Sequence, residues 1–321
     1  MVEELREKVK ALLENKDVEL VIGWERGSRA LAATPTFIDT PENVDRLIFD
    51  STCGNNPAVY FTKDSGRLVK AGKKVGVVVK GCDARALALY VAEKQIRREN
   101  VVVIGVPCRG VIDTNRVAAL TGGREVLEYS EGDGKVTVSG RDFDLTFDAG
   151  DVLSSACRAC VYPDARECDI FIGEARGGRS GEEQNAAIDE FEKFSPEERW
   201  EKMKEIYSKC IRCYACRNVC PSCYCNECFV DQNDPQWIGK THELTDTMIF
   251  HIIRNLHVAG RCVECGACER ACPMGLNLLL LNRKVAREVE ERFGYVAGID
   301  AGEKPAMADF REDEQQDFIM G

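Results

Sequence analysis

Two copies of one cysteine motif lie in the second half of the chain. Each has the pattern C-x2-C-x2-C-x3-C-P, and the cysteines are Cys210, Cys213, Cys216 and Cys220, then Cys262, Cys265, Cys268 and Cys272. Three cysteines with two-residue gaps can wrap a tight loop around one iron–sulfur cubane. The fourth cysteine lies too far along the chain to close on that cubane and ligates the other one. The spacing therefore predicts two [4Fe–4S] clusters.

The crossing of the fourth cysteines fixes both expected ligand sets. The first cluster is expected on Cys210, Cys213, Cys216 and Cys272, and the second on Cys262, Cys265, Cys268 and Cys220. A zinc scaffold without a redox role is the competing interpretation. Zinc sites use paired C-x2-C knuckles rather than a triplet followed by Cys-Pro, so the motif favours iron–sulfur clusters and electron transfer.

A third group of cysteines precedes the motifs. Cys157, Cys160 and Cys168 supply three thiolates, one fewer than a cubane needs. Either Cys82 or Cys108 is expected to complete the set. Both follow the carboxyl ends of predicted parallel strands, where ligands collect in such sheets. The sequence does not separate these two candidates.

Three further cysteines, Cys223, Cys225 and Cys228, follow the first motif within six residues. They could form an additional metal site if Cys53, or the spare member of the pair above, joined them. Three ligands so close together are geometrically awkward, so buried thiols packed near the clusters are the alternative.

The elements that position these cysteines divide the chain. Residues 1–180 are expected to form an α/β domain with a parallel sheet, a small antiparallel addition and the cysteine loop at 157–168. The strand, helix and strand predicted at 74–80, 84–98 and 101–106 form a βαβ unit. The other expected regions are a linker and helix at 181–206, a mainly α-helical dicluster domain at 207–300, and an acidic tail at 301–321.

Composition limits the class of protein. The 321 residues are 44% hydrophobic, and the net charge of −11 argues against nucleic acid or an anionic membrane as partner. No run is long enough to span a membrane, and the amphipathic start has no signal-peptide pattern, so a cytoplasmic location is expected. In that compartment, seventeen cysteines indicate thiolates gathered around metal rather than disulfides.

Two stretches resemble known families. The sequence VVVKGCDARALALYVAEKQIRRENVVVIGVPCRG, followed by CRACVYPDARECDIFIGE, is similar to the beta subunits of coenzyme F420 hydrogenases and formate dehydrogenases. CIRCYACRNVCPSCYCNEC extends this likeness over about residues 74–228. AGRCVECGACERACPMGLNLLLLNR resembles the α-helical ferredoxin domains of heterodisulfide-reductase iron–sulfur subunits, over about residues 204–293.

These resemblances imply a third [4Fe–4S] cluster near a flavin. The chain has no G-x-G-x-x-G fingerprint and no Ser-Gly-Gly-type segment like that of the family's flavin-binding region, so FAD stays an alternative. The expected function is an iron–sulfur electron-transfer subunit of a larger anaerobic oxidoreductase complex. Its implied partner is a heterodisulfide-reductase-type flavoprotein, a hydrogenase or a formate dehydrogenase. The alternative is a flavin-dependent beta subunit that exchanges electrons with coenzyme F420 or another two-electron carrier.

Overall fold

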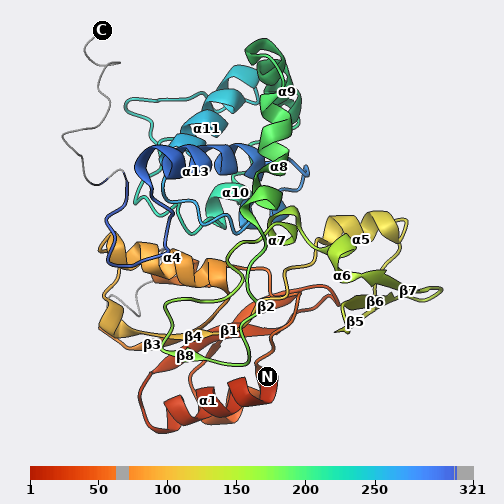
Figure 1. Cartoon of the computed structure of the whole chain (residues 1–321), viewed down its shortest axis with the longest axis vertical. Coiled ribbons are helices and arrows are strands. Elements are labelled where there is room, and N and C mark those ends of the chain that lie inside the picture. The colour runs from red at the N-terminus through yellow and green to blue at the C-terminus, as the bar shows by residue number, and fades with distance from the viewer. Residues whose placement is uncertain (63–71, 307, 309–321) are drawn as a thin grey trace.

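The computed structural model describes residues 1–62, 72–306 and 308, so most of the predicted acidic tail lies outside the described residues (Figure 1). The N-terminal part is built on a mixed five-stranded sheet in the order β2-β1-β3-β4-β8. Only β2 runs antiparallel to its neighbour. The strands are β1 (Leu20–Arg26), β2 (Ala33–Ile38), β3 (Val75–Val79), β4 (Val101–Gly105) and β8 (Ile170–Phe171).

The central strands β3 and β4 are buried on both faces because helices cover the sheet from either side. Val77 and Val79 of β3 pack toward helix α4 (Gly81–Ala92), whereas Val78 packs on the side of α1 (Val2–Glu14). Figure 1 shows α1 and α4 on opposite sides of the sheet. This arrangement explains the continuous β-branched runs in the sequence and confirms the predicted α/β class with its mostly parallel sheet.

A separate three-stranded antiparallel sheet forms the small addition expected from the sequence. It projects to one side of the main sheet together with two short helices (Figure 1). Its members are β5 (Glu128–Gly132), β6 (Lys135–Ser139), β7 (Asp144–Asp148), α5 (Thr114–Leu120) and α6 (Ala149–Val152). Val136 and Val138 of β6 are buried against Val117 of α5, which gives this unit a hydrophobic core of its own.

The C-terminal part is helical, as predicted. The bounds are α7 (Ser155–Arg158), α8 (Gly181–Glu192), α9 (Pro196–Ser208), α10 (Ala215–Asn218), α11 (Leu244–His257), α12 (Ala267–Arg270) and α13 (Leu279–Phe293). Ser195 caps α9 by accepting a hydrogen bond from the Glu198 amide at 3.2 Å. The segment expected as a linker contains α8, which packs on α13 through ion pairs from Arg287 to Asp189 and Glu192.

The two parts of the chain share one hydrophobic core. Val263 and Ala297 of the helical part belong to the same buried cluster as Val77 and Leu87 of the α/β part. The buried side chain of Arg85 donates hydrogen bonds to the carbonyl oxygens of Ala297 (3.0 Å) and Val263 (3.3 Å). The cysteine motifs are therefore held directly against the sheet.

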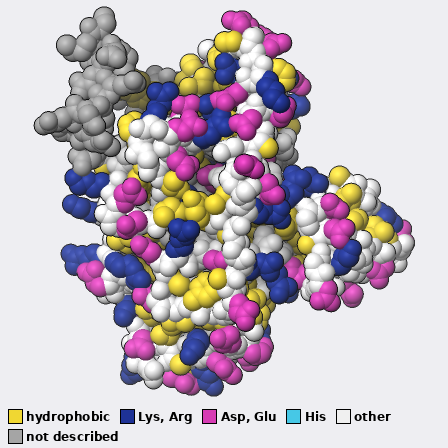
Figure 2. All heavy atoms as spheres, in the orientation of Figure 1, with side chains coloured by type: hydrophobic (Ala, Val, Ile, Leu, Met, Phe, Trp, Pro, Cys, Tyr) yellow, Lys and Arg dark blue, Asp and Glu magenta, His cyan; other side chains and the backbone are white. Residues whose placement is uncertain are grey.

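The surface carries charge of both signs without one dominant patch on the face that Figure 2 shows. Within the described part of the chain, no helix is long and apolar enough to cross a bilayer.

Gly81 provides a test of how closely α4 meets the cysteine loop. A Cβ at Gly81 would lie 2.1 Å from the carbonyl oxygen of Tyr162, whereas a Cβ at Gly181 would meet nothing within 4 Å. Each glycine is the first residue of its helix. Gly81→Ala should lower the free energy of unfolding by about 2 kcal/mol through overpacking. Gly181→Ala should raise it by about 0.5 kcal/mol by restricting the unfolded chain.

Denaturant unfolding of both variants, prepared without oxygen, measures the difference. Equal effects of the two substitutions would contradict the close packing of α4 against residues 162–164.

Candidate metal centres

The two motif loops repeat an unusual backbone conformation. Arg212 and Tyr214 have φ values of 50° and 59°, and their counterparts Glu264 and Gly266 have values of 55° and 66°. Left-handed conformations are uncommon for residues other than glycine and are costly unless the surroundings enforce them. Each loop thus turns back on itself at equivalent places, which aims its first three cysteines inward.

Three members of the first predicted set, Cys210, Cys216 and Cys272, belong to one hydrophobic cluster, which also contains Cys268. That they ligate one iron–sulfur cluster stays a prediction. Burial raises the pKa of the Cys210 thiol, and the negative charges of Cys272 and Cys213 raise it further. Burial also raises the pKa of Cys216, with Cys210 and Cys272 acting in the same direction. These effects require proximity, so Cys272 of the second motif lies with three cysteines of the first.

The second predicted set shows the corresponding pattern, with Cys220 of the first motif beside cysteines of the second. Burial raises the pKa of Cys265 to about 12 and that of Cys268 to about 11, and the charge of Cys220 contributes to both shifts. Cys220 and Cys268 also raise the pKa of the buried Cys262 thiol. Cys220 of the first motif is therefore near enough to these three cysteines to affect their pKa values, as the predicted crossing requires.

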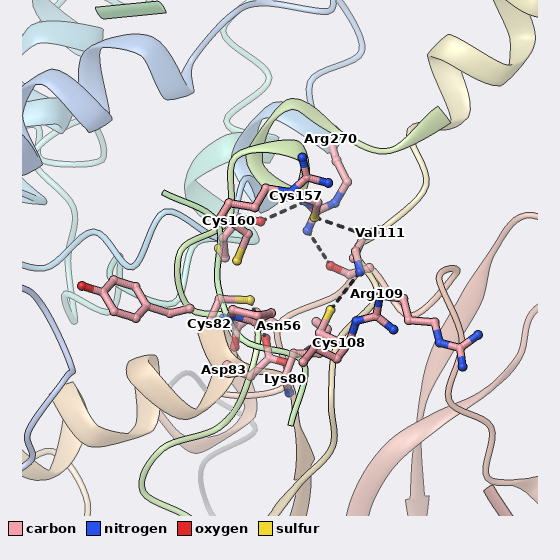
Figure 3. A pocket seen from close by; sticks show the side chains of 18 of the residues that line it. Asn56, Lys80, Cys82, Asp83, Cys108, Arg109, Val111, Cys157, Cys160 and Arg270 are labelled. Atoms are coloured by element: carbon pink, nitrogen blue, oxygen red, sulfur yellow. Dashed lines mark hydrogen bonds and ion pairs between the residues drawn. The ribbon is translucent and has the colours of Figure 1, made fainter. Parts of the chain in front are cut away.

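Four other cysteines surround a cavity of about 160 Å³ at the edge of the main sheet. In Figure 3, the sulfur atoms of Cys82, Cys108, Cys157 and Cys160 point toward this common space. Cys82 lies in the first turn of α4, directly after β3, and Cys108 lies three residues after β4. Because parallel strands end at the same edge, both thiols reach one site.

Cys168 differs from its expected place. It lies where a Cβ on Gly105 would approach its Sγ to 3.1 Å, and its thiol contacts the carbonyl oxygen of Ala165 at 3.7 Å. It does not line the cavity that contains Cys157 and Cys160. The sequence predicted Cys168 with one of the two strand-end cysteines, whereas the structure groups both strand-end cysteines and leaves Cys168 beside β8.

The cavity also contains a polar atom without a protein partner. The Nδ2 atom of Asn56 is buried and makes no hydrogen bond within the described residues. Its side chain lines the same cavity and lies beside Cys82 (Figure 3). An orphan donor next to four thiols fits a bound group that carries acceptor atoms, such as the sulfides of a cubane. Four thiols and one donor thus fit a [4Fe–4S] cluster.

Among the residues described, no three His, Cys, Asp or Glu side chains converge closely enough to hold a single metal ion. In a tetrahedral zinc site, the Zn–S length of about 2.3 Å brings the sulfurs about 3.8 Å apart. A cubane binds each thiolate at a different iron and does not require such convergence.

Arg270 lies between the third and second cysteine sets. It is half-buried, and its guanidinium donates hydrogen bonds to the carbonyl oxygens of Cys265 (2.9 Å) and Gly54 (2.7 Å). Burial alone would lower its pKa, but the charges of Cys157 and Cys265 raise it instead. Cys265 also lines the 160 Å³ cavity, so the two sets are immediate neighbours.

Helix α11 places two residues that sequence reasoning missed. Arg254 donates a hydrogen bond to the Cys216 carbonyl oxygen at 3.3 Å. The charges of Cys220 and Cys268 overcome its burial and raise its pKa, so its cation lies between the first and second sets. The Nε2 atom of His251 lies 3.3 Å from the Cys210 sulfur, and its ring stacks on Tyr207. Arg254 and His251 are three residues apart and so share one face of the helix, a pattern that was visible in the sequence.

The remaining cysteines separate into two places. Cys53 is enclosed in the core beneath α1, where burial raises its pKa to about 12. Cys223, Cys225 and Cys228 line a second cavity of about 380 Å³. Cys53 is therefore no partner for these three thiols.

A third cavity, of about 610 Å³, adjoins the four-cysteine site. The two cavities share Gly54, Asn56, Val111 and Arg270. Tyr60 and Val59 contribute to its apolar side.

Comparison with known proteins agrees with this geometry. The chain is 26% identical over 351 residues to the beta subunit of an F420-dependent formate dehydrogenase from Methanocaldococcus jannaschii, covering 91% of this chain and 90% of the relative. It is 25% identical to the beta subunit of F420-dependent formate dehydrogenase 1 from Methanococcus maripaludis, covering 93% and 91%.

A solved structure, a chain of the F420-reducing [NiFe] hydrogenase complex from Methanosarcina barkeri, matches with a TM-score of 0.40 and 17% identity. The match covers 64% of this chain and 84% of that one.

Two family models match. Residues 72–189 match the C terminus of the coenzyme F420 hydrogenase/dehydrogenase beta subunit, and residues 206–276 match the 4Fe-4S dicluster domain, which confirms the resemblances found in the sequence. The chain is thus similar, in two successive segments, to the coenzyme F420 hydrogenase/dehydrogenase beta subunit and to a 4Fe-4S dicluster domain.

Proposed function

We propose that this chain conducts electrons through three [4Fe–4S] clusters as a subunit of an oxidoreductase complex. The observation that supports the proposal is the proximity of the three predicted cysteine sets, since Cys265 of the second lines the same cavity as the thiols of the third. The charge of Cys265 in the second set contributes to the raised pKa of Cys82 in the third. The charge of Cys216 in the first set likewise contributes to the raised pKa of Cys268 in the second. The clusters supply one-electron chemistry when bound, and the protein's part is to hold them in this order.

The protein groups between the clusters favour electron transfer. The half-buried Arg270 and the buried Arg254 each place a cation between two predicted cysteine sets. A cation stabilises the more negative, reduced state of a neighbouring cluster and so raises its reduction potential. At the end of the series, Cys213 of the first set is exposed, which leaves a surface where a partner could exchange electrons.

The proposed partners are other redox subunits. The two curated relatives are named as beta subunits of F420-dependent formate dehydrogenases, and this chain covers about nine-tenths of each. By this likeness, a formate dehydrogenase or hydrogenase subunit, or a heterodisulfide-reductase-type flavoprotein, would take up or supply the electrons.

A flavin beside the third set is the second candidate. The 610 Å³ cavity has room for a flavin ring, and it shares Asn56 and Arg270 with the four-cysteine site. The orphan Asn56 Nδ2 is a suitable donor to a flavin ring atom as well as to a cluster. Such a flavin would join the two-electron chemistry of coenzyme F420 to the one-electron clusters. Released flavin, at about one per chain, would establish this candidate.

The third cluster is tested by comparing five single Cys→Ser variants. The replaced residues are Cys82, Cys108, Cys157, Cys160 and, as the matched control, Cys168. Each of the first four changes should remove about four irons and four sulfides per chain, because three thiolates hold a cubane poorly. Cys168→Ser should keep the full content. Iron and acid-labile sulfide analysis under nitrogen measures the outcome, and loss of iron from the control alone would refute the assignment.

Arg270 is tested by separating its charge from its hydrogen bonds. Arg270→Gln should lower the reduction potentials of the second and third clusters by on the order of 100 mV, the size of one charge at an effective dielectric constant of about 20. Arg270→Lys keeps the charge and should shift them much less. Redox titration followed by electron paramagnetic resonance (EPR) measures both variants. Equal shifts in the two variants would show that charge is not the cause.

A further inference from the structure

The second cavity contains a set of metal-ligating side chains that the three clusters do not use. Cys223, Cys225, Cys228 and His257 all line this space of about 380 Å³. His257 ends helix α11, and its ring packs edge-on against Phe229 with the centroids 5.3 Å apart. The three thiols come from the loop that follows Pro221. Two separate segments of the chain therefore converge on one cavity with three sulfurs and one imidazole.

Three arginines surround the same cavity, namely Arg217, Arg254 and Arg261. The Arg217 side chain is hydrogen-bonded to Cys228 and forms an ion pair of 2.6 Å with Asp231, which lines the same cavity. Arg261 lies over the ring of Tyr224, 4.5 Å from its centroid. Cations gathered around thiols stabilise the thiolate form, which is the form that binds metal.

Two buried polar atoms at this cavity have no protein partner within the described ranges. They are the Nε of Arg254, whose side chain is 4% exposed, and the hydroxyl of Tyr224. Buried polar groups are normally hydrogen-bonded, so two orphans at one cavity indicate a bound group with acceptor atoms. The sulfides and thiolates of an iron–sulfur cluster would supply such acceptors.

We propose that Cys223, Cys225, Cys228 and His257 hold a fourth iron–sulfur cluster, of the [4Fe–4S] type. Imidazole is an established iron ligand, and histidine in place of cysteine raises the potential of a cluster. The neutral imidazole also leaves one negative charge fewer beside the three arginines. The fourth cluster should therefore have a higher reduction potential than a comparable centre with four thiolates.

The position of this site would make the electron path branch. Cys223 donates a backbone hydrogen bond to the carbonyl oxygen of Cys220, a member of the second set, at 3.2 Å. Arg254 faces Cys223 as well as the first and second sets. Cys225 is exposed, so the fourth cluster would lie near the surface and offer a route to a second redox partner.

The metal content of the full chain tests the proposal. The Cys223→Ser/Cys225→Ser/Cys228→Ser variant should contain about four irons and four sulfides fewer than the wild type, both prepared and reconstituted without oxygen. Cys53→Ser, which removes a buried thiol elsewhere, is the matched control and should lose none. Equal iron in the triple variant and the wild type would overturn the proposal, as would loss of zinc in place of iron.

His257 gives a second test that does not depend on the stability of the triple variant. Pulsed EPR of the reduced wild-type protein should detect a strongly coupled ligand nitrogen. His257→Cys should keep the iron content, abolish that coupling and lower the potential of one cluster. An unchanged nitrogen signal, or no such signal in the wild type, would exclude His257 as a ligand.

This outcome is independent of the three-cluster function. The Cys82, Cys108, Cys157 and Cys160 variants report on the third cluster, whereas the substitutions at the second cavity leave those thiols in place. A chain with about twelve irons that are unaffected by the triple change would keep the electron-conducting function and refute only the fourth site.

Discussion

The structure depends on the burial of cysteine sulfurs where the helical part meets the sheet. Burial raises the pKa values of Cys265 and Cys268, which favours their neutral thiol form. A cationic metal centre bound there would take the place of the thiol protons and would couple metal binding to the folded arrangement. Arg270 and Arg254 supply fixed positive charge at the same places. The helical part must therefore stay close to the sheet for either interaction to persist.

The connections between the two parts follow from this requirement. Arg261 binds Glu93 of the α/β part with two hydrogen bonds, of 2.7 and 3.0 Å, and the hydroxyl of Tyr90 donates to the Pro221 carbonyl oxygen at 2.5 Å. Both contacts join α4, or the residue directly after it, to a motif loop. Helix α4 thus packs against the sheet on one side and contacts the motif loops on the other. A domain boundary near residue 180 or 207 separates the two parts along the sequence, but in the structure the two parts pack closely together.

Local sequence patterns predicted the parts of the fold that local physics determines. The β-branched runs of β3 and β4 were sufficient for the βαβ unit, whereas the crossed ligand sets inferred from the cysteine spacing stay a prediction. The third site needed tertiary information, because the loop between Cys160 and Cys168 carries Cys168 to β8. A linker and helix were expected at 181–206, and the sequence did not show that α8 in this stretch is held on α13 by ion pairs with Arg287. Arg254 and His251 act through contacts that only the packing of α11 creates.

The predicted crossing of Cys220 and Cys272 has a consequence for damage. Each motif loop supplies three thiols to one set and a single thiol to the other, so oxidation of one cysteine disturbs both loops. Loss of Cys220 would leave the second predicted set with three thiols. Cys220 also lies on the loop that supplies three thiols to the first predicted set. In the predicted arrangement, damage to either centre would therefore disturb the loop that holds its neighbour.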